Sequence, residues 1–231
     1  MKPDKSTNAK QTLDSMGEAA STDATFAFVD LSGFTALTEM CGDEQAAHLA
    51  GRLVELTRDS LALDVTVVKT MGDAVMIHAH GPDTMMATIL DLADRAADED
   101  GFLGLRAGIH HGSAVQRDHD YFGHAVNTAA RITALAGAGH AVITEPILPA
   151  CEALGVAAHP LGATELRNIS APVAVYRVQL PPPQYPTDPV CRVRIDPRTA
   201  THHLRHNDDD LWFCSDRCAQ RFAAHPARYA I

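Results

Sequence analysis

Two apolar segments that each end at an aspartate constrain the fold of this chain most strongly. Residues 26–29 are apolar and lead directly into Asp30. Residues 65–71 predict a second strand, which is followed by Gly72, by Asp73 and then by another apolar segment. A glycine between two such segments is typical of a hairpin turn. We therefore expect two carboxylates at the ends of neighbouring strands, where they can hold two divalent cations about 3.5–4 Å apart.

Four further polar residues have a spacing that suits a phosphate-bearing ligand. Lys69 lies four positions before Asp73 and is the only lysine after residue 10. Asn127 and Arg131 are four positions apart in a helix-like segment, so their side chains project from one face. An amide and a guanidinium on one face can grip a ribose and a phosphate together. Asp120 lies seven positions before Asn127, in the loop that leads into this helix.

Each of these residues has a plainer interpretation when it is taken alone. A single aspartate at a strand end is most often a turn or cap residue. A single lysine or arginine is usually a solvated surface charge. The functional interpretation therefore depends on the joint spacing of all six residues.

Three segments carry a resemblance to the class III nucleotidyl cyclases. They read FVDLSGFT at 28–35, KTMGD at 69–73 and DYFGHAVNTAAR at 120–131. A closing segment at 165–178 is similar to the last strands of that family, so the resemblance spans roughly residues 24–180. By this resemblance, Asp30 and Asp73 bind two Mg²⁺ or Mn²⁺ ions with help from the carbonyl group of Leu31. The other four residues then bind the nucleotide: Lys69 and Asp120 read the adenine edge, Asn127 orients the ribose, and Arg131 stabilises the charged phosphates in the transition state.

The resemblance implies an adenylate cyclase that converts ATP to 3′,5′-cyclic AMP and pyrophosphate. The ribose 3′-oxygen attacks the α-phosphorus in this reaction. ATP is favoured because guanine-specific members usually carry a different pair at the base-reading positions. In the family the metal-binding aspartates come from one chain and the base-reading and transition-state residues from another, so a chain with both sets is expected to form a head-to-tail homodimer. Two alternatives stay open: a catalytically silent cyclase-like regulator, and a metal-sensing protein that acts through its C-terminal cysteines.

Length and charge limit the classes of protein that this chain can represent. Its 231 residues allow one large domain, or a large and a small one. No apolar segment approaches the ~20 residues that span a bilayer, so we expect no membrane contact. The polar first 23 residues predict a disordered leader and a cytoplasmic protein. A formal net charge of −10 argues against nucleic-acid binding.

The order of predicted elements is typical of an α+β protein with the ferredoxin-like architecture of the cyclase family. The expected elements are a strand at 25–30, a long helix at 35–61, strands at 65–70 and 74–79, a helix at 83–98, a strand at 104–110, a helix at 124–136, a strand at 140–144, a short helix at 145–154 and a β-rich stretch to 179.

Residues 181–186, PPPQYP, predict a stiff linker because consecutive prolines favour extended geometry. The linker would separate a catalytic domain at 24–180 from a small module at 187–231. Three cysteines fall in this module: Cys191, Cys214 and Cys218. The last two lie one helical turn apart, with Ser215 able to cap that turn, so their thiolates and that of Cys191 can share one Zn²⁺ or Cu⁺ ion. His203 and His206 are candidates for the fourth ligand, which stays open.

The module resembles the YHS/TRASH metal-binding modules, through DPVC at 188–191 and LWFCSDRCAQRF at 211–222. It departs from that pattern at Arg192 and Val193, where Gly-Met is usual, and at Asp208, where a turn glycine is common. The plainer alternative is a set of buried thiols. Cys41 and Cys151 stand alone in the sequence, and we interpret both as small core hydrophobes.

Overall fold

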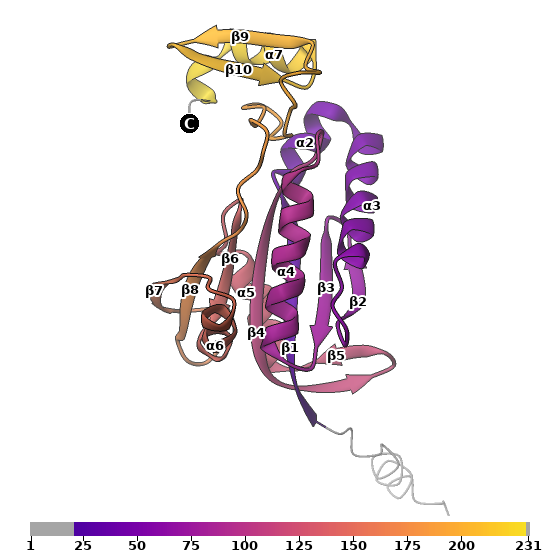
Figure 1. The fold of residues 1–231 in the computed structure, drawn as a ribbon, viewed down its shortest axis with the longest axis vertical. Helices are drawn as coiled ribbons and strands as arrows, with labels where there is room; N and C mark the ends of the chain where they lie inside the picture. The colour runs from indigo at the N-terminus through magenta and orange to yellow at the C-terminus, as the bar shows by residue number, and fades with distance from the viewer. Residues whose placement is uncertain (1–20, 230–231) are drawn as a thin grey trace, which may run out of the picture.

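A computed structural model describes residues 21–229 of the chain, and within them it contains one eight-stranded sheet and one two-stranded sheet (Figure 1). In the large sheet the strand order is β2-β3-β1-β4-β6-β8-β7, with β5 paired to β4. The strands are β1 (Ser21–Ser32), β2 (Thr66–Met71), β3 (Ala74–Ala79), β4 (Gly104–Arg117), β5 (Asp120–Phe122), β6 (His140–Thr144), β7 (Ala158–Thr164) and β8 (Val173–Gln179).

The central strand β1 is buried on both of its faces. Ala27, Val29 and Leu31 alternate along one face and belong to the main core. Phe26 and Phe28 point to the other face, where they pack under the helix α5 (His124–Thr133). Since Asp30 has the same parity as these two phenylalanines, its side chain emerges on the α5 side of the sheet.

Three helices cover the main-core face of the sheet: α2 (Phe34–Cys41), α3 (Asp43–Asp59) and α4 (Pro82–Ala97). The prediction of a single helix at 35–61 is wrong, because the helix is interrupted at Gly42, which lies between α2 and α3. Gly42 has φ 89°, a left-handed conformation that other residues adopt at a cost. The apolar spacing continues across the break, so periodicity alone did not reveal it.

Other boundaries also differ from the prediction. The strand expected at 104–110 continues to Arg117, and the loop that was to carry Asp120 forms β5, antiparallel to β4. Residues 21–23, placed in the leader, belong to β1 and pair with 113–115 of β4. The rest of the predicted leader lies outside the described residues. The segment expected as a short helix at 145–154 forms a 3₁₀ turn (Glu145–Ile147) followed by α6 (Leu148–Ala153).

Helix α5 packs against β4 at Gly108. A Cβ atom at this position would lie 2.4 Å from the backbone nitrogen of Thr133 and 2.6 Å from the carbonyl oxygen of Ala129. Only glycine permits this approach. The position of α5, and of the side chains on its outer face, therefore depends on a residue without a side chain.

The C-terminal region forms a hairpin and a helix above the end of α2 (Figure 1). Strands β9 (His202–His206) and β10 (Asp209–Phe213) are joined by Asn207 and Asp208, which have φ 50° and 68°. These two residue types tolerate positive φ in a two-residue hairpin loop, which explains why Asp208 can replace the usual glycine. Helix α7 (Asp216–Ala224) follows, and a 3₁₀ turn (Pro226–Arg228) ends the described chain.

The C-terminal region shares one hydrophobic core with the rest of the molecule. Val190, Val193 and Phe213 belong to the same buried cluster as Leu37 and Phe102. The proline-rich segment 181–186 also runs along the molecule, since the amide of Gln184 donates to the carbonyl oxygen of Ala97 at 3.2 Å. No helix within residues 21–229 is long and apolar enough to cross a bilayer.

Candidate active site and cysteine centre

Asp30 and Asp73 come together at one edge of adjacent strands. Asp30 pairs with Ala74 in the β1–β3 register, and the amide of Leu31 donates to the carbonyl oxygen of Asp73 at 3.2 Å. Gly72, with φ 62°, turns the β2–β3 hairpin so that Asp73 faces the end of β1. Burial, and then the negative charge of Asp30, raise the pKa of the Asp73 carboxyl. A partly buried carboxyl group beside a second carboxylate is a setting in which a divalent cation is held.

One oxygen of Asp30 is buried and unpartnered. Oδ1 has no hydrogen-bond partner among the described residues, whereas Oδ2 accepts from Nε of Arg106 at 2.8 Å and also from Nη2. A buried acceptor without a partner is costly, and a cation coordinated at Oδ1 would remove that cost. The residues therefore fit the divalent cations expected here.

Sequence reasoning missed Arg106. The feature of the sequence that could have revealed it is a single arginine inside the predicted apolar strand at 104–110. Arg106 lies directly opposite Asp30 in the β1–β4 register. Its guanidinium holds one carboxylate oxygen of Asp30 in a fixed orientation, and the other oxygen is left for a ligand.

Lys69 and Asp120 form an ion pair across β2 and β5. The Lys69 Nζ to Asp120 Oδ2 distance is 2.6 Å, and the amide of Tyr121 donates to Asp120 Oδ1 at 2.8 Å. The hydrogen bond from Lys69 lowers the pKa of the Asp120 carboxyl. Both side chains are partly exposed, so the pair contributes little to stability. Each keeps free hydrogen-bonding positions, because an ammonium has three donors and a carboxylate about four acceptor sites.

Asn127 and Arg131 lie one turn apart on the outer face of α5, and both are exposed. Within residues 21–229, neither side chain has a hydrogen bond or an ion pair. The opposite face of α5 is buried through Val126, Ala129 and Ile132. In the structure, Asp30 lies beside Asp73 and Lys69 pairs with Asp120. Neither pair has a hydrogen bond or an ion pair with Asn127 or Arg131.

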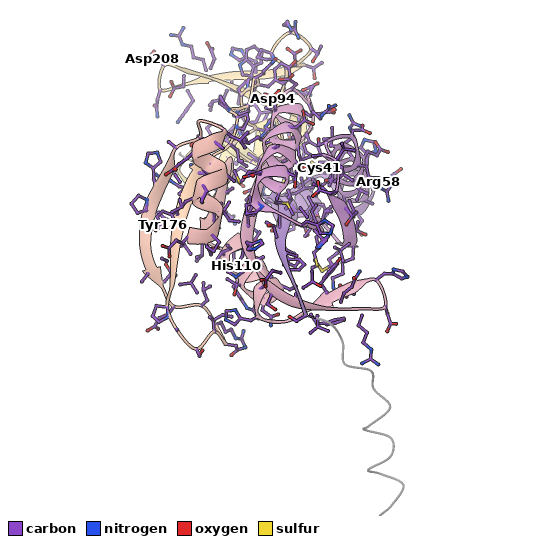
Figure 2. All side chains as sticks on the ribbon, turned by 60° about the horizontal axis from the view of Figure 1, so that its bottom comes forward. Cys41, Arg58, Asp94, His110, Tyr176 and Asp208 are labelled. Atoms are coloured by element: carbon purple, nitrogen blue, oxygen red, sulfur yellow. The ribbon has the colours of Figure 1, made fainter. Side chains whose placement is uncertain are left out.

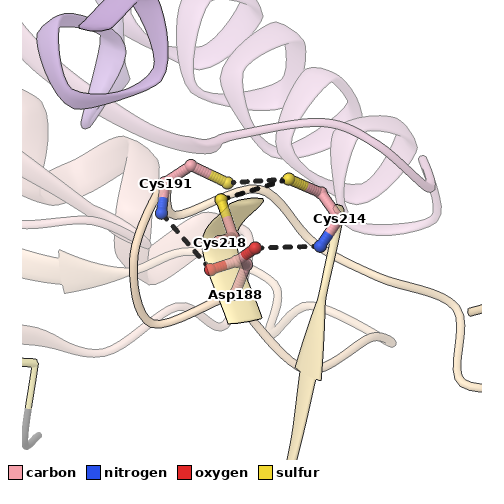
Figure 3. Close-up of side chains that lie close together, drawn as sticks. All are labelled: Asp188, Cys191, Cys214 and Cys218. Atoms are coloured by element: carbon pink, nitrogen blue, oxygen red, sulfur yellow. Dashed lines mark hydrogen bonds between the residues drawn. The ribbon is translucent and has the colours of Figure 1, made fainter. Parts of the chain in front are cut away.

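The three C-terminal cysteines form a compact cluster, which we call the cysteine triad: Cys191, Cys214 and Cys218 (Figure 3). The Sγ atoms of Cys191 and Cys214 are 3.4 Å apart, and those of Cys214 and Cys218 are 3.5 Å apart. Hydrogen bonds with the other two thiols hold the pKa of Cys214 far below its usual value. Ser215 caps α7 as predicted, since its Oγ accepts from the amide of Cys218 at 3.3 Å. The triad is suited to a thiophilic cation.

The fourth polar group beside the triad is Asp188, whereas His203 and His206 contact other residues. The potential ligand atoms of Asp188 and the triad all lie within 4.8 Å of one another. The Nε2 atom of His203 instead contacts Asp210 Oδ1 at 2.8 Å, and the His206 ring packs against Phe222 with ring centroids 5.3 Å apart. Each of these two histidines therefore has a partner other than the thiols.

Comparison with known proteins places this geometry in a family. Residues 18–179 match the family profile described as Adenylate and Guanylate cyclase catalytic domain. The chain belongs to this family. The fold class predicted from the sequence and the resemblance to cyclases are thereby confirmed.

Curated relatives of this cyclase-family chain carry adenylate cyclase names. The chain is 40% identical over 159 residues to a pH-sensitive adenylate cyclase of Mycobacterium tuberculosis, with 67% of this chain and 40% of that protein covered. It is 34% identical over 110 residues to an adenylate cyclase of Streptomyces griseus, with 47% and 28% covered. The chain therefore spans two fifths of the length of the first protein and less of the second.

Solved cyclase structures share the fold. Adenylate cyclases from Trypanosoma brucei in their monomeric state superpose with a TM-score of 0.63 at 21% identity, covering 75% of this chain and 93% of theirs. The adenylyl cyclase CyaB from P. aeruginosa superposes with a TM-score of 0.57 at 24% identity, covering 70% and 95%. At this identity the likeness establishes the fold of the cyclase-family region.

Proposed function

We propose that this protein is an adenylate cyclase that converts ATP to 3′,5′-cyclic AMP and pyrophosphate at a site shared by two copies of the chain. The observation that carries the proposal is the buried, unpartnered Oδ1 of Asp30 beside the carboxyl group of Asp73. Membership of the cyclase catalytic family and the adenylate cyclase name of the 40% identical relative support it.

The two aspartates are the proposed ligands of two Mg²⁺ or Mn²⁺ ions, with the carbonyl of Leu31 beside them. Bound there, the ions would lower the pKa of the ribose 3′-hydroxyl and neutralise the polyphosphate. The 3′-oxygen forms a bond to the α-phosphorus, the bond to pyrophosphate breaks, and the hydroxyl proton leaves to solvent. Arg106 keeps the Asp30 carboxylate oriented throughout.

The ion pair of Lys69 and Asp120 is the proposed adenine-reading group. Lys69 brings donors and Asp120 brings acceptors, so together they match a base edge that presents both kinds of group. A base with the reverse pattern would leave these groups unpaired, which is the strongest available source of discrimination.

The proposal of a homodimer rests on Asn127 and Arg131. Both side chains are exposed and unpaired within the described chain, although an amide and a guanidinium on one face suit a ribose and a phosphate. A second copy would bring them to the aspartates of its partner. Each homodimer would then hold two equivalent sites.

We further propose that the cysteine triad binds one Zn²⁺ or Cu⁺ ion. Sγ separations of 3.4 and 3.5 Å are close to the ~3.8 Å edge of a tetrahedral zinc–thiolate site with Zn–S bonds of about 2.3 Å. The centre makes a metal-responsive cyclase the second candidate function, whereas a catalytically silent regulator has no comparable observation in its favour.

The test is a turnover assay of the purified full chain with ATP and either Mg²⁺ or Mn²⁺. We expect cyclic AMP from the parent and none from Asp30→Ala. The control is Asp94→Ala, which removes an exposed carboxylate from α4 (Figure 2). No cyclic AMP from the parent, or equal rates for the parent and Asp30→Ala, would contradict the proposal.

A further inference from the structure

The C-terminal region contacts both ends of α2, the helix that follows β1 and Asp30. At the start of the helix, the Arg192 side chain lies so close to Gly33 that a Cβ there would be 3.0 Å from its Cβ atom. At the end, Nη1 of Arg217 donates to the carbonyl oxygen of Met40 at 3.1 Å, and Nη1 of Arg221 lies 3.3 Å from the Met40 sulfur. The contacts therefore connect the cysteine region to a helix that begins four positions after Asp30.

Asp188 is already engaged by the backbone. Its Oδ1 accepts from the amides of Val190 at 2.8 Å and Cys191 at 3.3 Å, and its Oδ2 accepts from the amide of Cys214 at 2.9 Å. This fully buried carboxylate thus fixes the segment that carries Cys191 next to the segment that carries Cys214. Such hydrogen bonds are characteristic of a group that orients the ligands of a metal, so a fourth thiolate is the alternative to direct coordination by Asp188.

Cys41 is a fourth cysteine that lines the same cavity as Cys214 of the triad. It is the last residue of α2, is half-buried, and lines one cavity of about 560 Å³ together with Cys214, Ser215 and Arg217. Figure 2 shows it in the helical layer.

We propose that Cys41 is the fourth thiolate of a tetrahedral zinc centre completed by the cysteine triad. The proposal rests on the metal site proposed above for the triad. Zinc binding would displace the remaining thiol protons to solvent and form four Zn–S bonds. The ion would thereby tie the C-terminal region to the helix that follows the catalytic Asp30, a link between residues 150 positions apart in the sequence.

The experiment uses the reduced full chain and cobalt(II) as a spectroscopic probe, with zinc as competitor. Cys41→Ala should lose roughly a quarter of the thiolate-to-cobalt absorbance, because one of four Co–S bonds is lost. Its zinc affinity should fall by more than about 100-fold, since losing a direct ligand costs more than losing an orienting group. The matched control is Cys151→Ala, a buried cysteine in α6, which should keep the parent spectrum and affinity.

The outcomes distinguish the role proposed for Cys41 from the metal site proposed for the cysteine triad. A parent-like spectrum and zinc affinity in Cys41→Ala, with binding lost in Cys214→Ala, would overturn the role of Cys41 and leave the triad intact. A parent protein that binds neither cobalt nor zinc would overturn both.

A second measurement needs no variant. Alkylation of the parent protein, followed by mass spectrometry, should show Cys41 modified without zinc and protected with it, together with the triad. Equal modification of Cys41 in both states would also overturn its assignment.

Discussion

Magnesium should stabilise this protein through Asp30 and Asp73, independently of any turnover. Oδ1 of Asp30 is buried without a hydrogen-bond partner among residues 21–229, and an unsatisfied buried acceptor costs about 1–3 kcal/mol. A ligand at about 100 times its Kd adds about 2.7 kcal/mol to the free energy of unfolding, which is the same scale. At about 2–4 °C per kcal/mol for a protein of this size, we expect Tm to rise by about 5–11 °C.

Scanning calorimetry of the full chain across a Mg²⁺ titration measures this rise. Mg²⁺ is the suitable ion because it prefers oxygen ligands and leaves the cysteines free. Asp73→Asn should lose most of the rise, and Asp94→Ala should retain it. A full Mg²⁺-dependent rise in Asp73→Asn would refute the assignment of these carboxylates as the cation site.

The pH dependence of the same measurement has a definite sign. Burial, and then the charge of Asp30, raise the pKa of Asp73 in the folded state, so folding favours its protonated form. The stability that this group contributes is present below its unfolded pKa and is lost as pH rises through the raised folded pKa. Without Mg²⁺, the parent should therefore lose more stability than Asp73→Asn as pH rises from the unfolded to the raised folded pKa of Asp73.

Three further predictions concern the nucleotide groups and the packing of α5. Alanine at both Lys69 and Asp120 should reduce the ATP-to-GTP ratio of kcat/KM by at least about tenfold, and an unchanged ratio would remove them from base selection. Arg131→Ala should lower kcat by roughly 10²–10³ at an unchanged Tm, the scale for losing one transition-state donor, and a parent-like kcat would exclude that role. Gly108→Ala should destabilise the fold by about 3 kcal/mol, because its Cβ would lie 2.4 Å from atoms of α5. The control Gly51→Ala has no atom within 4 Å of the added Cβ and should be neutral or stabilising. Equal melting temperatures of the two variants would contradict the close packing of α5 on β4.

The hairpin of β2 and β3 could be predicted from the sequence because each apolar segment stops at a polar residue or a glycine. Asp73 and the turn at Gly72 lie where that rule places them, whereas β1 continues beyond Asp30 to Ser32. The helix break at Gly42 could not be placed in this way, since the apolar spacing of α2 continues into α3. A backbone conformation with positive φ decides it, and periodicity carries no information about φ.

The remaining site residues depend on contacts between distant segments. Arg106 meets Asp30 through strand register, and Asp188 meets Cys214 through a loop that packs below the β9–β10 hairpin. His203 and His206 of β9 had the right chemistry for a metal, but their partners are Asp210 in β10 and Phe222 in α7. Spacing along the chain identified candidate ligands, and only packing could choose among them.

Mixing two inactive variants tests the shared two-metal site most directly. Asp30→Ala and Arg131→Ala should each make little or no cyclic AMP alone. After subunit exchange at equal concentrations, half of the dimers pair the two variants and one of the two sites in each is intact, so activity should reach roughly a quarter of the parent rate. Mixtures that stay inactive although subunit exchange is demonstrated would contradict a site built from two copies of the chain.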